Sequence, residues 1–402
     1  MAVYLDHAAT TPLRPEARDA WLAASEVVGN ASSVHGAGQQ ARRLLEDARE
    51  RFAAVIGCQP VEVVFTSGGT ESINLALKGL WWGREPSSDV VVLPDGEHHA
   101  TLEAVQWLQE RDAARIRPVR LDPFARIPPD GFASAVAGPG VALATALVAS
   151  NEAGTVQDVA GLAAAAAAAG VPLHLDAVSA FGQLPVRFRG WRGDAAGATG
   201  LVALSVSGHK VGAPVGTGAL VVSRDARMTP LLHGGGQQRS LRAGTQDIAG
   251  AAALSVAAEQ AERERDAESA RLGELRQRIV DGIRARVPEA VLLGHPEDRL
   301  AGNVHLLLPG AEGESLLFLL DVAGISVSTG SACQAGVSEP SHVVMAMGYD
   351  ERAARQVLRI TLGRTSSEAD VAALLDVLPA AYRQVARPGG DASPGARSHE
   401  RS

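Results

Sequence analysis

The chain has 402 residues, a formal net charge of −8 and 46% hydrophobic residues. This length exceeds one ordinary hydrophobic core and predicts about two domains. The acidic balance gives no support for nucleic-acid binding, and no stretch approaches the ~18–20 apolar residues of a membrane helix. The first residues, MAVYLDHAATT, show no basic segment followed by an apolar one, so we expect no signal peptide.

Apolar runs alternate with helical stretches from about residue 15 to residue 260. The predicted strands are 61–66, 90–93, 141–149, 172–176, 202–206 and 218–222. The predicted helices between them include 71–80, 101–111 and 162–169. This alternation predicts an α/β fold with a mainly parallel sheet that is covered by helices on both faces.

A long charged helical region over residues 251–287 is expected to lead into a second, smaller α+β domain. Its predicted strands lie near 304–308 and 358–362, and its predicted helices near 314–323 and 367–386. We therefore expect a large domain of residues 15–260 and a small domain of residues 1–14 and 261–387. The tail over 388–402 shows no periodicity and is expected to be disordered.

Cys58 and Cys333 are the two cysteines of the sequence, and they do not form a CxxC pair. A disulfide framework or a metal site held by cysteines is therefore not expected, and a reducing cytoplasm is the natural location. Cys58 borders a turn and is interpreted as incidental. Cys333 lies among small and polar residues in STGSACQAG, a context that is typical of an accessible, reactive thiol.

Lysine is rare in this sequence. Of 37 basic side chains, only Lys78 and Lys210 are lysines, an excess of arginine that coding bias largely explains. Lysine, unlike arginine, can become the neutral amine that a Schiff base requires. Lys210 follows a predicted buried strand in the sequence SGHK, which is a poor place for a solvated side chain, although an incidental lysine remains the alternative.

Asp176 ends the predicted strand 172–176. A carboxylate there is costly to bury without a cationic partner, and an acid beside a pyridine nitrogen keeps that nitrogen protonated. A helix N-cap is the alternative. The segment TSGGTES over 66–72 joins a predicted strand to a helix, so its small residues and hydroxyls can hold a phosphate. Its spacing is neither that of a Walker A motif nor GxGxxG.

Two further residues carry chemistry. His98 follows the predicted strand 90–93, where an imidazole can stack on a flat cofactor and move protons, but the adjacent His99 leaves the choice between them open. Arg359 lies in the strand sequence LRITLG. It is either an ordinary ion-pair partner or the group that binds a substrate carboxylate.

Taken together, these motifs resemble the cysteine desulfurases of the IscS/NifS-like branch of the class V aminotransferases, which have the pyridoxal-phosphate (PLP) fold type I. The resemblance covers nearly the whole chain apart from the tail. It rests on the segments YLDHAATTP, GNASSVH, TSGGTES, EHHAT, NEAGTVQD, SGHKVG, HGGGQQRSLRAGT, STGSAC and LRITLGRTS.

The resemblance implies that the enzyme removes sulfur from L-cysteine with PLP. The products would be L-alanine and a persulfide on Cys333. That sulfur would pass to acceptor proteins for iron–sulfur cluster assembly or thiolation, and no membrane or direct nucleic-acid partner is expected. A homodimer is also implied.

The resemblance assigns a role to individual residues. Lys210 would bind PLP as a Schiff base, Asp176 would contact the ring nitrogen, and His98 would stack on the ring. The phosphate would be held by Gly69, Thr70, Ser207 and His209, with Thr245 reaching the phosphate of the partner subunit. The substrate carboxylate would be bound by Asn151 and Arg359. Ser179 is a departure, because the family usually has a glutamine there that donates to the cofactor's phenolic oxygen.

Two alternative functions stay open at this point. The first is an aminotransferase or lyase of the same fold, for example a selenocysteine lyase, and the thiol of Cys333 argues against it. The second is a non-catalytic binding or scaffold protein. The joint presence of Lys210, Asp176, Cys333 and Arg359 argues against the second. The segment QAGVSEPSH after Cys333 is expected to be mobile, so that one thiol can reach both the cofactor and an external acceptor.

Overall fold

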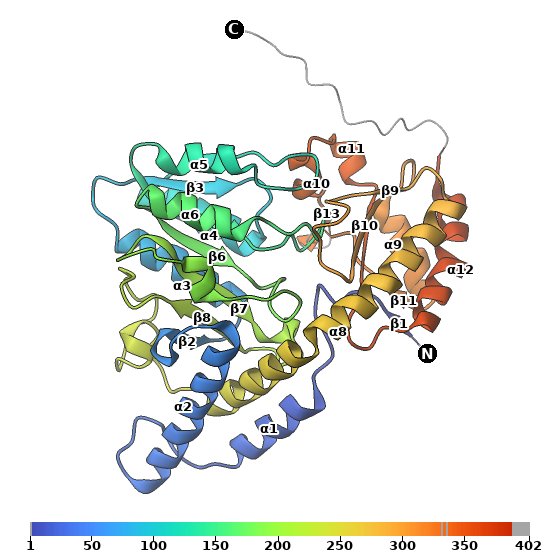
Figure 1. Ribbon diagram of the computed structural model, residues 1–402. Helices are drawn as coiled ribbons and strands as arrows, with labels where there is room; N and C mark the ends of the chain where they lie inside the picture. The colour runs from blue at the N-terminus through green and yellow to red at the C-terminus, as the bar shows by residue number, and fades with distance from the viewer. Residues whose placement is uncertain (1, 331–332, 335–336, 388–402) are drawn as a thin grey trace.

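The computed structural model describes residues 2–330, 333–334 and 337–387, with only the backbone for residues 333–334 and 337–338. Figure 1 shows a large α/β part and a smaller C-terminal part joined by one long helix. The predicted disorder of the tail concerns residues outside this description, and so does the side chain of Cys333. No helix of the described residues is long and apolar enough to cross a membrane.

A seven-stranded sheet forms the centre of the large part, in the order β2-β8-β7-β6-β5-β3-β4. The strands β3 to β7 run parallel, and β8 pairs antiparallel with both β7 and β2. The strands are β2 (Val63–Thr66), β3 (Val90–Pro94), β4 (Arg115–Val119), β5 (Val141–Leu147), β6 (Pro172–Asp176), β7 (Gly200–Ser207) and β8 (Gly218–Val222). The predicted mainly parallel sheet is therefore confirmed.

Helices cover both faces of this sheet because successive strand residues point to opposite sides. Val63 and Phe65 belong to one buried cluster and Val64 to another. The helices of the large part are α1 (Pro15–Ser25), α2 (Gly36–Ile56), α3 (Gly69–Trp82), α4 (His99–Asp112), α5 (Pro129–Ala137), α6 (Val159–Ala168) and α7 (Phe188–Arg192). Helices α3 and α4 contribute to one cluster, and α2, α5 and α6 to the other.

The smaller part is built on a three-stranded antiparallel sheet in the order β14-β10-β9 and a parallel pair of β1 with β11. Its remaining pair, β12 with β13, is antiparallel. The strands are β1 (Val3–Tyr4), β9 (Val291–Leu292), β10 (Asn303–Leu307), β11 (Ile325–Ser326), β12 (Cys333–Gln334), β13 (Val337–Ser338) and β14 (Val357–Thr361). The helices are α9 (Gly313–Val322), α10 (His342–Ala346), α11 (Glu351–Ala354) and α12 (Glu368–Val385).

Helix α8 (Ile248–Arg286) connects the two parts and packs in both. Leu254 belongs to the cluster of the large sheet, whereas Leu275 and Ile279 belong to the cluster of the small sheet. The division of the chain near residue 260 remains a prediction. Helices α10 and α11 pack with the core of the large sheet, through Val343 and Ala353.

Most predicted elements are found with small changes in their bounds. The predicted strand 61–66 begins only at Val63, because residues Pro60–Glu62 form a 3₁₀ turn. The predicted strand 141–149 ends at Leu147. The edge strand β4 and the helices α1, α2 and α5 were not among the predicted elements. Ser367 caps helix α12, as its hydroxyl accepts from Asp370 N, which confirms the expected start of that helix.

Candidate active site

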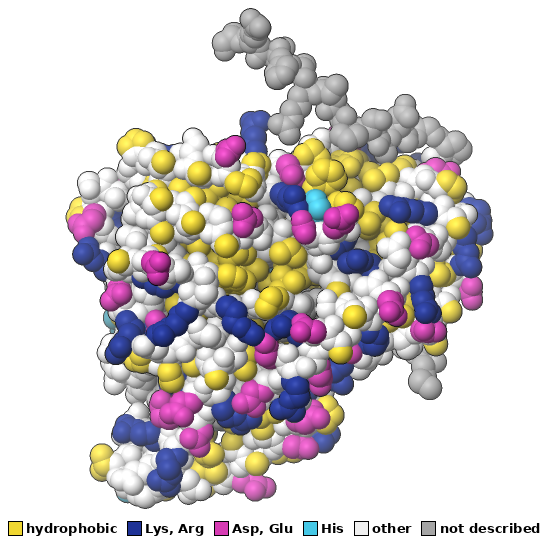
Figure 2. All heavy atoms as spheres, viewed as in Figure 1, with side chains coloured by type: hydrophobic (Ala, Val, Ile, Leu, Met, Phe, Trp, Pro, Cys, Tyr) yellow, Lys and Arg dark blue, Asp and Glu magenta, His cyan; other side chains and the backbone are white. Residues whose placement is uncertain are grey.

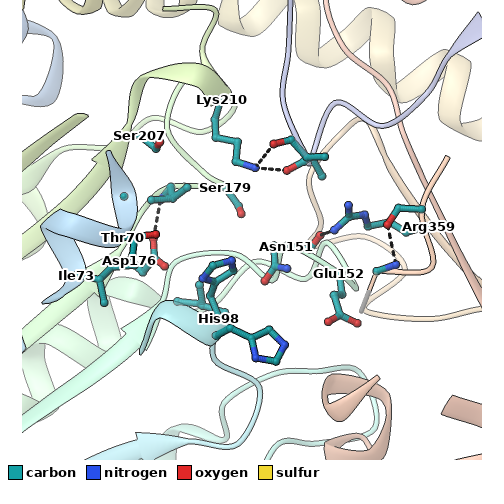
Figure 3. Close-up of a pocket in the computed structure, with 18 of the residues that line it drawn as sticks. Thr70, Ile73, His98, Asn151, Glu152, Asp176, Ser179, Ser207, Lys210 and Arg359 are labelled. Carbon is teal, nitrogen blue, oxygen red and sulfur yellow. Dashed lines mark hydrogen bonds between the residues drawn. The ribbon is translucent and has the colours of Figure 1, made fainter. Parts of the chain in front are cut away.

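A cavity of about 320 Å³ lies at the carboxyl ends of the parallel strands, where open α/β sheets place ligands. Four predicted residues reach it directly from the strand ends: His98 after β3, Asp176 at the end of β6, Ser207 at the end of β7, and Lys210 in the turn that follows. Figure 3 shows these side chains around one space, with Arg359 entering from β14 of the smaller part.

Lys210 follows β7 in a short 3₁₀ turn, and its side chain is directed toward the N-terminal segment. Its Nζ donates to the carbonyl oxygens of Ala8 and, over 2.8 Å, of Ala9. Burial first, and then the positive charge of Arg359, lower the pKa of Lys210 to about 8. About a tenth of such an amine is neutral at pH 7, so the group is prepared for nucleophilic chemistry.

Asp176 is buried, and its Oδ1 accepts a hydrogen bond from Val178 N over 2.8 Å. Burial raises the pKa of Asp176 to about 6, while the Val178 hydrogen bond and Lys210 act in the opposite direction. The carboxyl group therefore remains mostly ionised at neutral pH. It can hold a proton on a heterocyclic nitrogen in the cavity.

His98 caps helix α4, and its Nδ1 accepts from Ala100 N over 3.1 Å. Burial lowers the pKa of His98 to about 4, and Lys210 adds to this effect. The imidazole is therefore neutral at physiological pH, with its proton on Nε2. His99 also lines the cavity, but its ring contacts His342 in an edge-on arrangement with centroids 4.9 Å apart.

The N-terminus of α3 forms one wall of the cavity with Gly69 and Thr70. A Cβ on Gly69 would lie 2.8 Å from Val178 Cγ2, so only glycine lets the helix start come this close. Ser207 and His209 face the same region, and burial lowers the pKa of His209 to about 4. A helix start with hydroxyls beside it is well suited to a phosphate group.

Arg359 lies in β14 and is buried. Its Nη2 donates to Asp6 Oδ1 over 3.0 Å, and its Nη1 donates to the carbonyl oxygen of Asn151 over 3.1 Å. Its Nε has no hydrogen-bond partner among the described residues. The guanidinium is thus held in place beside the cavity and retains capacity to bind a carboxylate.

Glu97 is a second buried carboxyl group near Asp176. Burial first, and then the charge of Asp176, raise the pKa of Glu97 to about 8. Its Oε1 accepts from Leu147 N over 2.8 Å, and Oε2 has no partner among the described residues. Glu97 is therefore mainly protonated and neutral at pH 7, whereas Asp176 carries the negative charge.

For two predicted residues the structure shows no place in this cavity. Thr245 is exposed and does not line it, and the side chain of Cys333 is not described. Ser179 does line the cavity. The sequence did not point to Asp6, Glu97, Glu152 or His342, although Asp6, Glu97 and Glu152 lie inside the quoted motifs YLDHAATTP, EHHAT and NEAGTVQD.

The chemistry of the groups around the cavity fits pyridoxal phosphate. The amine of Lys210, the carboxylate of Asp176 and the start of α3 surround one space. Gly69 has no side chain that would crowd the wall at the start of α3. The described residues contain no group of three or more His, Cys, Asp or Glu side chains that could hold a metal ion.

Acidic and basic side chains are intermixed on the molecular surface seen in Figure 2.

Comparisons with other proteins agree with this architecture. The model of the family described as "Aminotransferase class-V" matches residues 3–374. An IscS-like cysteine desulfurase from Mycobacterium tuberculosis is 47% identical over 395 residues, covering 96% of this chain and 97% of the relative. A cysteine desulfurase IscS from Methanosarcina thermophila is 37% identical, covering 94% of this chain and 91% of the relative.

Solved structures agree as well. A NifS-like protein superimposes with a TM-score of 0.86 at 30% identity, covering 94% of this chain and 99% of that one. The resemblance inferred from the motifs and the fold type expected from it are confirmed by these matches.

Proposed function

The chain belongs to the class V aminotransferase family, and on that premise we propose that it is a cysteine desulfurase that uses pyridoxal phosphate. The observation that carries the proposal is the meeting of Lys210, Asp176 and Arg359 around one cavity. An amine with a lowered pKa, a buried carboxylate and a fixed guanidinium are the groups that this cofactor and an amino-acid substrate require together.

The residues that would hold the cofactor follow from their positions. Lys210 would bind it covalently, Asp176 would hold the proton on its ring nitrogen, and His98 would lie against its ring. Its phosphate would be held by Gly69, Thr70, Ser207 and His209. Pyridoxal phosphate, when bound, supplies an electron sink for the electrons released at the substrate Cα.

The chain's own residues would then perform the remaining work. Arg359 and Asn151 orient the substrate through its carboxylate. Lys210, released as a neutral amine once the substrate's amino group has taken its place, would accept the proton from Cα. The thiolate of Cys333 attacks the sulfur of the substrate, so the carbon–sulfur bond breaks and a persulfide forms on Cys333. Protonation of the remaining carbon skeleton gives L-alanine.

Ser179 is the position where the proposal departs from the family pattern. It is half-buried and lines the cavity, and its carbonyl oxygen accepts from Gln183 Nε2 over 3.2 Å. A serine side chain is shorter than the usual glutamine. We infer that a water molecule held by Ser179 replaces the direct donor to the cofactor's phenolic oxygen.

A homodimer is part of the proposal and is supported by the position of Thr245. This residue is exposed, and its neighbours Gln237, Arg239 and Gln246 border a second cavity of about 750 Å³ at the surface. Arg242 is held against the start of α3 by its ion pair with Glu71 over 2.8 Å. An exposed hydroxyl on such a segment is available to the phosphate in another copy of the chain.

The fate of the sulfur and the place of action are also proposals. The persulfide of Cys333 would pass to acceptor proteins in iron–sulfur cluster assembly or thiolation. Two cysteines without a CxxC pair support a reducing cytoplasm as the location.

The test is turnover of L-cysteine by the purified protein in the presence of PLP and a thiol reductant. We expect L-alanine and sulfide in equal amounts. A transamination product without sulfide would favour a same-fold aminotransferase, release of selenium from L-selenocysteine with no sulfide from L-cysteine would favour a lyase, and no turnover of any of these would favour a binding protein.

A further inference from the structure

Glu152 lies in the turn after β5, and none of the proposed steps uses it. Its side chain lines the cavity, yet the residue is only 2% exposed. Figure 3 shows its carboxylate at the side of the cavity near Arg359. A buried carboxylate needs strong hydrogen-bond donors, so its partners indicate what it holds in place.

The first partner is Ser341, whose Oγ donates to Glu152 Oε2 over 2.5 Å. Ser341 is fully buried, and the same Oγ accepts from Val344 N over 3.1 Å as the N-cap of α10. Because a lone pair of Ser341 Oγ accepts from the helix backbone, the hydroxyl hydrogen is free to point toward the carboxylate of Glu152. Hydrogen bonds to a charged group are stronger than neutral ones, so this contact fixes where α10 begins.

The second contact is with Gly330, 11 residues earlier in the chain. A Cβ on Gly330 would lie 3.2 Å from the same Oε2 of Glu152, so the backbone passes directly beside the carboxylate. Its φ of 87° also favours glycine. Just before it, Ser328 pairs with Arg359 in an antiparallel bridge. Gly330, which precedes Cys333 in the chain, and Ser341, which follows it, therefore both lie at one carboxylate.

The turn that carries Glu152 is itself fixed. Ser150 Oγ accepts from the backbone nitrogens of Glu152 and Ala153 over 3.3 and 3.1 Å. Asn303 Nδ2 donates to the carbonyl oxygen of Glu152 over 3.0 Å. Asn151, the preceding residue, accepts from Arg359 as described above. The same short turn thus contacts the proposed carboxylate-binding arginine and both ends of the Cys333 segment.

We propose that Glu152 is a positioning residue for the sulfur-transfer step: its carboxylate binds Ser341 and lies directly beside the backbone of Gly330, on either side of Cys333 in the chain, and thereby sets where Cys333 is presented to the cavity. This inference rests on the proposed function. It assigns no proton transfer to Glu152, and it predicts that losing the carboxylate affects the thiol step and leaves substrate binding at the cofactor intact.

The experiment uses the PLP-loaded protein and compares Glu152→Ala, Glu152→Gln, Ser341→Ala and the double variant Glu152→Ala/Ser341→Ala. Single-turnover mixing with L-cysteine gives two rates, the spectral change of the bound cofactor and the appearance of the Cys333 persulfide. We expect Glu152→Ala to slow persulfide formation about tenfold, as the loss of a charge-assisted hydrogen bond implies, with the spectral change within about twofold of wild type.

The conservative and double variants make the test specific. Glu152→Gln retains an oxygen that accepts from Ser341, and we expect it to recover most of the persulfide rate. Glu152→Ala and Ser341→Ala remove the same bond, so the double variant should be no slower than the slower single variant. Additive losses in the double variant would overturn the proposal.

Two control variants distinguish a specific effect on the position of Cys333 from a general loss of structure. Ser367→Ala removes the capping hydroxyl of α12, and Glu62→Gln alters another buried glutamate outside the cavity. Both should keep the wild-type persulfide rate. Equal slowing of the spectral change and of persulfide formation in Glu152→Ala would mean a structural or substrate-binding role. If Glu152→Ala does not fold, Ser341→Ala alone must show the selective slowing.

Different results would overturn the proposed function and the proposed role of Glu152. Absence of a persulfide on Cys333 in the wild-type protein would overturn the proposed function. A normal wild-type persulfide, together with wild-type rates in both Glu152→Ala and Ser341→Ala, would overturn only the role of Glu152.

Discussion

Arg359 donates to Asp6 across 353 positions of sequence, with 3.0 Å between Nη2 and Oδ1. The ion pair joins the N-terminal segment to β14 and is largely shielded from solvent, with side-chain exposures of 7% for Arg359 and 18% for Asp6. Because a second Nη contacts Asn151, the guanidinium is oriented before any substrate arrives. This preorganisation lowers the entropic cost of binding a carboxylate.

Arg359→Lys tests that orientation. Lysine keeps the charge but cannot hold Asp6 and Asn151 with a planar fork and still present donors to a carboxylate. We expect the KM for L-cysteine to rise about tenfold or more, with a smaller change in kcat. Steady-state kinetics measure both values. An unchanged KM would show that the substrate carboxylate is bound elsewhere.

The amine of Lys210 gives a prediction about pH. Its pKa is lowered to about 8, mainly by burial and then by Arg359, while Asp6 and Asp176 act to raise it. The neutral amine predominates above the pKa, so capture of PLP by the cofactor-free protein should speed up with pH and level off above about 8. Stopped-flow absorbance at several pH values measures this rate.

Two variants check the assignment to Lys210. Lys210→Ala should abolish both covalent capture and turnover. Arg359→Gln should move the midpoint of the pH profile upward, since a positive charge that lowers the pKa is removed. A borohydride-reducible adduct that persists in Lys210→Ala would transfer the role to Lys78, the other lysine of the sequence.

Gly69→Ala tests the narrow wall at the start of α3. The added methyl group would lie 2.8 Å from Val178 Cγ2, so Val178 and the adjoining turn must shift. Overpacking of this kind costs about 1–3 kcal/mol, and we expect PLP affinity to fall about tenfold. Gly36→Ala is the matched control at another helix start, because no atom lies within 4 Å of its added Cβ. Equal affinities in both variants would contradict a role of the α3 start in binding the phosphate.

Ser179→Gln tests the departure from the family pattern. A longer donor at this position would contact the cofactor's phenolic oxygen directly and favour its ionised form, so the pH midpoint of the bound cofactor's absorption spectrum should shift downward. Spectral titration measures the midpoint. No shift would mean that a direct side-chain donor stabilises the ionised oxygen no better than the water proposed at Ser179.

Much of the fold could be predicted because its strands carry a local signal. Runs such as 172–176 and 218–222 are apolar and bounded by turns, and the structure has both strands with the same bounds. Strand β4 was missed because RIRPV alternates charged and apolar residues with a proline, which suits an exposed sheet edge but gives no buried-strand pattern.

Some residues of the candidate site could likewise be predicted from the sequence, and others could not. Asp176 and Lys210 could be found because each follows an apolar strand, and strand ends meet at one edge of a parallel sheet. Asp6 and Glu152 could not be singled out, since their partners lie 353 and 189 positions away. Only the folded chain shows that Asp6 binds Arg359 and that Glu152 binds Ser341.

The most direct test of the account is the mass of the protein after reaction with L-cysteine under anaerobic conditions without a reductant. We predict that the PLP-loaded protein gains one sulfur atom on the peptide that contains Cys333, with one L-alanine formed per sulfur bound. Cys333→Ser should retain PLP and its spectral response to L-cysteine, yet gain no sulfur. Sulfur on Cys58 instead, or alanine formation at the wild-type rate in Cys333→Ser, would contradict the central claim.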